Sequence, residues 1–215
     1  MKLIYQTLLT IHIISGCLGL LTGTINILKK KGGKQHRQIG RLFVFFMIIA
    51  GISSIALALF KFNIFLLVVG VFTIYLIASG DRYMRLRHLG KGQKPELLDW
   101  LLCLGMLFCG ILFVVWGSYL VYQSNNFGIV LIVFGLIGLT NVWIDLKNYS
   151  GRSKRKKYWM LAHIGRMMGG YTASLTAFIV VNADHFPFEI NSIILWLGPT
   201  LLLTPLSIYW SKPYK

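Results

Sequence analysis

Four polar residues lie within or at the ends of long apolar runs of this sequence, where they are candidates for chemistry. His163 and Arg166 are three residues apart, and Asn141 and Asp145 are four apart, so each pair shares one face of a helix. Ionisable groups inside a bilayer are costly, and they mark sites for ligands, ions or protons. The sequence therefore predicts a polar cluster that contains Arg166, Asp145 and Asn141, with His163 beside it.

The histidines are candidate ligands of a cofactor. Neutral imidazoles can bind haem iron from two helices, and a protein that carries electrons across a membrane needs one pair near each surface. His36 with His163 would form the inner pair, and His12 with His185 the outer pair. This interpretation gives cofactor-binding roles to His12, His36 and His163, with b-type haem as the cofactor.

Three other interpretations stay open. Zinc could bind His36, His163 and Asp145 and activate water, although no paired-ligand motif such as H-E-x-x-H is present to define a metal site. Arg166 and the aspartates could form the anion or ion site of a carrier or small-molecule binding protein. In a non-enzymatic structural component, Arg166 would pair with Asp145 only to stabilise helix contacts. These patterns leave open whether the protein is an enzyme.

Seven apolar runs must position these residues. The chain has 215 residues, of which 56% are hydrophobic and 13% charged, whereas about 25% are charged in soluble domains. A helix of roughly 20 apolar residues crosses the bilayer core. We therefore predict an all-α, polytopic bundle of seven transmembrane helices in a single domain, residues 1–215, with spans at about 5–28, 39–60, 62–80, 97–122, 127–146, 158–182 and 190–210.

Small residues recur every four positions in the sixth run, at Gly165, Gly169, Ala173 and Ala177. Helices in lipid approach closely where side chains are small. We therefore expect this stripe, Gly165 included, to contact another helix.

Basic residues gather in alternate connections. Residues 29–41 carry six Lys or Arg, residues 81–96 carry five, and residues 147–157 carry six, whereas the connections between them carry one or none. Cationic loops remain in the cytoplasm, so we predict an external N-terminus and a cytoplasmic C-terminus. Topology thus accounts for the formal net charge of +16 without a nucleic-acid partner, and we expect these loops to bind anionic lipid headgroups. No pattern predicts the oligomeric state.

Several motifs resemble known membrane proteins. The segments His12–Gly16, followed by a Gly-rich helix, and His36–Arg41 resemble a family of predicted prokaryotic multi-spanning membrane proteins filed as a domain of unknown function. The segments His163–Tyr171 and Trp196–Thr200 resemble the C-terminal half of similar bacterial proteins. There is a faint similarity to the cytochrome b561 and ferric reductase class, without its paired in-helix histidines at each leaflet. The resemblance implies a bacterial cytoplasmic (inner) membrane location and no established activity.

The predicted orientation can be tested by labelling single cysteines in a variant without Cys17, Cys103 and Cys109. Asn125→Cys should react with an impermeant maleimide on intact cells, and Lys156→Cys should react only after the membrane is opened, because the basic connection remains in the cytoplasm. Labelling of both positions from the same side would contradict the topology.

Overall fold

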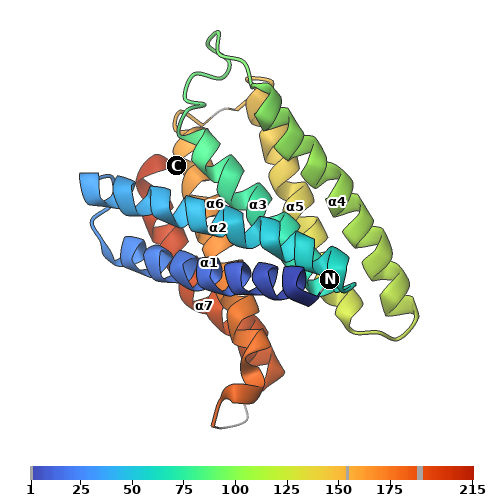
Figure 1. The fold of residues 1–215 in the computed structure, drawn as a ribbon. Coiled ribbons are helices and arrows are strands. Elements are labelled where there is room, and N and C mark those ends of the chain that lie inside the picture. The colour runs from blue at the N-terminus through green and yellow to red at the C-terminus, as the bar shows by residue number, and fades with distance from the viewer. Residues whose placement is uncertain (1, 154, 188–190) are drawn as a thin grey trace.

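The computed structural model describes residues 2–153, 155–187 and 191–215, and these residues form a helical bundle (Figure 1). Each of seven α-helices in the described residues is long and apolar enough to cross a membrane, which confirms the predicted fold class. They are α1 (Lys2–Leu28), α2 (Lys34–Phe60), α3 (Ile64–Tyr83), α4 (Leu97–Tyr122), α5 (Phe127–Tyr149), α6 (Tyr158–Val181) and α7 (Ser192–Ser211). The short 3-10 helices η1 (Ala183–His185) and η2 (Lys212–Tyr214) follow α6 and α7.

Helix α3 occupies the centre of the bundle. It contacts α2, α4, α5 and α6, while α1 packs on α2, α4 on α5, and α6 on α7 (Figure 1). By contrast, α5 and α6 have little direct backbone contact, although they follow one another in the chain. The backbones of these two helices therefore do not pack closely against each other.

The three basic connections lie at one end of the bundle, which we call the basic end: Lys31 of the first and Lys157 of the third lie over the rings of Trp210 and Tyr214 at the end of the chain. The Tyr158 hydroxyl donates a hydrogen bond to the Leu86 carbonyl (2.7 Å) and accepts one from the Leu89 amide (2.9 Å), which joins the second connection to the start of α6. Gly90 and Gly151 approach closely there with positive φ angles, so the second and third connections touch. The basic end comprises residues 29–33, 84–96, 150–153 and 155–157 with the adjoining helix termini.

Several helices extend beyond the predicted spans at the basic end. Helix α2 begins at Lys34, so His36 lies in its first turn, whereas the span was expected to begin at residue 39 with His36 outside it. Helices α3 and α5 each continue three residues past the predicted boundaries and include Tyr83 and Asn148. The apolar pattern stops at the first charged residue, but the helical backbone continues, and Tyr83 and Asn148 are buried inside the bundle. At the opposite end, Asn63 caps α3 by accepting a hydrogen bond from the Leu66 amide (3.1 Å).

Glycines permit the closest helix contacts. A Cβ atom on Gly117 of α4 would lie 2.6 Å from the Gly128 carbonyl oxygen of α5, so only glycine fits this contact. On α6, Gly170 meets Ile77 of α3, whereas a Cβ on Gly165 would meet no atom within 4 Å. The expected helix contact is therefore wrong at Gly165, whereas Gly169 of the same stripe faces Leu76 of α3 and Ala173 packs against the core cluster that contains Leu76.

A Cβ at Gly117 should separate α4 from α5. We expect Gly117→Ala to lower the free energy of unfolding by about 1–3 kcal/mol, the usual cost of overpacking. Gly105→Ala is the matched control on the same helix, because a Cβ there meets nothing within 4 Å. Thermal unfolding of the purified protein in detergent measures both changes, and equal unfolding temperatures for the two variants would contradict the packing described.

Candidate functional site

Arg166 of α6 is buried in the bundle against Asp145 of α5. The two residues are 1% and 0% exposed. The Arg166 Nη2 donates to Asp145 Oδ1 at 2.5 Å and to the Asn141 carbonyl oxygen at 3.2 Å. The structure thus brings together Arg166 and Asp145, while Asn141 contributes its backbone and directs its side-chain amide to the Ile137 carbonyl (2.9 Å). This ion pair spans the gap between two helices that scarcely touch.

Two tyrosines from α3 complete the surroundings of the ion pair. The Tyr75 hydroxyl donates to Asp145 Oδ2 (2.7 Å), and the Tyr83 hydroxyl donates to Asp145 Oδ1 (2.6 Å). Their rings also face the Arg166 guanidinium, with its carbon 5.2 Å and 4.6 Å from the ring centroids. Asn148 donates to the Tyr83 hydroxyl (3.0 Å). We call Arg166, Asp145, Tyr75, Tyr83 and Asn148 the Arg166 cluster.

Sequence reasoning missed three members of the Arg166 cluster. Tyr75 and Tyr83 lie in or next to an apolar run, where a tyrosine is unremarkable, and Asn148 lies in a connection that looked solvated. The one available signal was that a buried tyrosine hydroxyl needs a hydrogen-bond partner. That rule does not identify which helix supplies the partner.

The Arg166 cluster has one unused donor. Asp145 accepts hydrogen bonds from Tyr75, Tyr83 and Arg166, so its carboxylate is well compensated. The Arg166 Nη1 is buried, and none of the described residues accepts a hydrogen bond from it. A buried donor without an acceptor is costly. The cluster is therefore complete around the carboxylate but incomplete around the guanidinium.

Arg166 lines a groove between α5 and α6 at the basic end. The groove has a volume of about 430 Å³ and is lined by residues of both helices and of the connection between them. Lys147 and Arg155 provide two further cations, Asn148 and Tyr158 add polar atoms, and none of the described lining residues is acidic. We call this space the α5–α6 groove.

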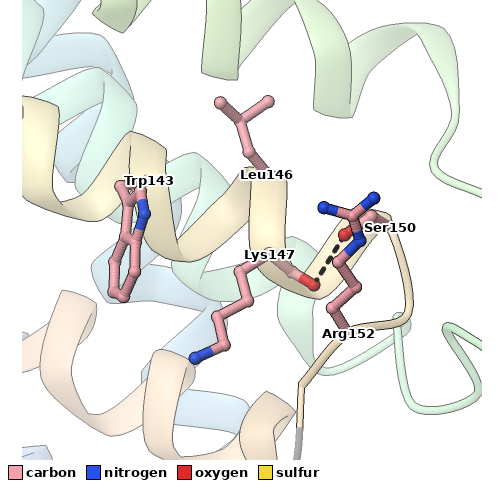
Figure 2. Close-up of a pocket in the computed structure, with 5 residues that line it drawn as sticks. All are labelled: Trp143, Leu146, Lys147, Ser150 and Arg152. Carbon is pink, nitrogen blue, oxygen red and sulfur yellow. Dashed lines mark hydrogen bonds between the residues drawn. The ribbon is translucent and has the colours of Figure 1, made fainter.

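A second hollow of about 420 Å³ adjoins the C-terminal end of α5 and shares Trp143 and Lys147 with the α5–α6 groove. Figure 2 shows that the Lys147 side chain extends away from the Arg152 guanidinium. The Lys147 ammonium lies 5.1 Å from the centroid of the Trp143 ring. This end of α5 therefore carries cations over an exposed aromatic surface.

The candidate histidines occupy three different settings. The His163 ring Nδ1 bonds to the Gly80 carbonyl oxygen (2.9 Å), and His12 Nδ1 bonds to the Ala50 carbonyl oxygen (3.0 Å) and lies 3.2 Å from the Ser53 hydroxyl. A carbonyl only accepts, so both rings carry their proton on Nδ1. His36 lies in the first turn of α2 and is half-buried. His12 bonds to α2, and no hydrogen bond joins it to the exposed His185 in the described part of the chain.

The surroundings of the histidines give no support to haem or zinc. A haem needs a slot between its axial imidazoles, but neither of the two hollows is lined by a histidine. Among the described residues, no group of three or more His, Cys, Asp or Glu could hold a metal ion. The zinc set of His36, His163 and Asp145 is not formed, because Arg166 and the two tyrosines enclose the Asp145 carboxylate.

A second ion pair fixes the basic end. Arg82 of α3 donates from Nε and Nη2 to the two carboxylate oxygens of Asp99 at the start of α4, both at 2.8 Å. Glu96 adds a contact to Arg82 at 3.0 Å, and its amide donates to Asp99 (2.8 Å). A bidentate pair of this kind sets geometry as well as charge. It anchors the connection 84–96 beside the start of α6.

The ion pair of the Arg166 cluster predicts a non-additive effect on stability. Arg166→Leu leaves Asp145 as an uncompensated buried charge and should lower the free energy of unfolding by about 3–5 kcal/mol. Adding Asp145→Asn removes that charge and should restore a large part of the loss. Thermal unfolding in detergent tests this, with the exposed Arg155→Leu as control; additive losses in the double variant would contradict a coupled pair.

Comparison with known proteins finds a similarity to one protein family over part of the chain. Residues 9–93 match the model of a family described as "Predicted membrane protein (DUF2306)". No curated protein and no solved structure matches the chain. The matched segment includes His12 and His36, whereas Asp145 and Arg166 lie beyond it. Over residues 9–93, the chain is therefore similar to a family of membrane proteins of unknown function, as the resemblance in its sequence indicated.

Proposed function

We propose that the protein is a membrane-embedded binding protein that takes up a molecule through its anionic group in the α5–α6 groove. The observation that carries this proposal is the buried Arg166 Nη1, which lacks an acceptor among the described residues although Arg166 lines the groove. Guanidinium groups bind carboxylates and phosphates through paired hydrogen bonds. A phosphate or carboxylate oxygen would supply the missing acceptor.

The charges around the groove favour an anion. Asp145 balances the charge of Arg166, so Lys147 and Arg155 remain as surplus cations, and none of the described lining residues is an acid. Arg166 is buried, and a charge-assisted hydrogen bond is stronger at a buried group than in water. The groove volume of about 430 Å³ also falls in the range of roughly 300–1,000 Å³ that is typical of ligand sites.

The open space favours binding over a purely structural role. If the ion pair only joined helices, α5 and α6 would be expected to pack against each other around it. Instead they have little direct contact, and the groove separates them. Haem-linked electron transfer forms no part of the proposal, since the surroundings of His12, His36 and His163 do not support it.

The location proposed for this site follows from charge. We place the basic end on the cytoplasmic side of a bacterial inner membrane, because cationic connections are retained there. The α5–α6 groove then lies at the cytoplasmic leaflet. An anionic metabolite and the headgroup of a lipid in that leaflet can both reach it.

Glycerol 3-phosphate, a phosphate monoester without an acyl chain, is a suitable probe of the anion site. At constant ionic strength it should raise the unfolding temperature of the purified protein in a saturable manner, because binding to the folded state stabilises it. Lys147→Gln combined with Arg155→Gln should weaken its Kd about tenfold or more, because two charged contacts are lost. Both residues are exposed and lie outside the Arg166 cluster, so the fold should be retained.

The control for this measurement is Lys91→Gln combined with Lys94→Gln. It removes the same charge from an exposed connection at the basic end, away from the groove. The control should bind glycerol 3-phosphate as the wild-type protein does. The proposal fails if stabilisation by the probe does not saturate, or if the control and the groove variant weaken binding equally.

A further inference from the structure

We infer that the α5–α6 groove holds an anionic membrane lipid, with its phosphate at the three cations and part of an acyl chain against the apolar wall. This inference rests on the proposed function, because it assigns the anionic group to a particular class of molecule. It goes beyond general attraction of headgroups to basic loops, since it places one lipid between two named helices. Three features of the groove support it.

The first feature is the position of the groove between two membrane-spanning helices. Both α5 and α6 are long and apolar enough to cross the bilayer, and they have little direct contact. A gap between two such helices opens sideways towards the lipid. A lipid can therefore move into it from within its own leaflet, whereas a soluble ion reaches it only from the connection at the basic end.

The second feature is the apolar wall. Besides its cations, the groove is lined by Trp143, Ile144, Leu161 and Ala162. Trp143 is 62% exposed on the outside of α5. A soluble anion would leave this apolar surface uncovered, whereas the acyl chain of a lipid would lie against it.

The third feature is the unfilled space beside Gly165. Gly165 lines the groove, and a Cβ placed on it would meet no atom within 4 Å. Neighbouring Gly169 and Gly170 instead face Leu76 and Ile77 of α3. The absence of a side chain at Gly165 therefore creates room in the groove rather than a close helix contact.

Charge and depth agree with the boundary between headgroup and chain. Lys147 and Arg155 lie towards the end of the groove nearest the connection, while Arg166 and Gly165 lie two turns inside α6. Lysine and tryptophan side chains such as Lys147 and Trp143 are typical of the membrane interface, where phosphates meet the first methylene groups. Clusters of basic side chains at this depth attract anionic lipid headgroups.

Filling the space at Gly165 tests the chain without changing the cations. Native mass spectrometry of the full-length protein in a neutral detergent would measure binding of phosphatidylglycerol and of phosphatidylcholine with the same acyl chains. The wild-type protein should prefer phosphatidylglycerol, and Gly165→Leu should weaken its Kd about tenfold. Glycerol 3-phosphate should still bind to Gly165→Leu, because Lys147, Arg155 and Arg166 remain.

Gly105→Leu is the matched control, since Gly105 also has open space around it but lies on α4, away from the groove. It should bind both probes as the wild-type protein does. A competition experiment on the wild-type protein supplements the two variants. Excess glycerol 3-phosphate should displace phosphatidylglycerol and leave phosphatidylcholine adducts unchanged. This competition keeps the inference testable even if Gly165→Leu does not fold.

The outcomes separate the inference from the proposed function. Unchanged phosphatidylglycerol binding in a folded Gly165→Leu, equal binding of the two lipids, or no displacement by glycerol 3-phosphate would overturn the lipid assignment. If glycerol 3-phosphate still binds in a manner that depends on Lys147 and Arg155, the proposed function stands without it. If neither probe depends on those cations, both proposals fail.

Discussion

The burial of one guanidinium governs the interior of this bundle. Arg166 lies within a membrane-spanning helix and is almost inaccessible, and an unpaired charge in such a place would be very costly. Asp145 supplies the opposite charge, and Tyr75 and Tyr83 satisfy the remaining oxygen lone pairs and cover the guanidinium with their rings. Three helices must therefore meet at a single point, and α3 becomes the centre of the fold because it carries both tyrosines.

The same interaction explains why two helices remain apart. A long arginine side chain can bridge α5 and α6 at a distance, so the ion pair stabilises their arrangement without close backbone packing. Elsewhere the bundle closes tightly, as at Gly117 and Gly128 between α4 and α5. Tight packing on one side and a bridged gap on the other leave the α5–α6 groove, which Arg166 lines.

Charge distribution links the topology of the chain to its candidate site. The basic connections that favour a cytoplasmic location also place Lys147 and Arg155 at the mouth of the α5–α6 groove. A second ion pair, between Arg82 and Asp99, fixes the neighbouring connection 84–96. That connection is thus held beside the start of α6 by a buried ion pair.

The sequence by itself determined the membrane class and the seven helices, because a helix must have a long apolar run to cross the bilayer, and such runs are visible in the sequence. It also singled out Arg166 and Asp145, since opposite charges in apolar runs call for compensation. Tertiary structure alone decided which helices touch: it brought Tyr75, Tyr83 and Asn148 to Asp145, and turned Gly165 towards open space. These contacts depend on the relative rotation and spacing of helices that are distant in sequence, and hydropathy carries no information about either.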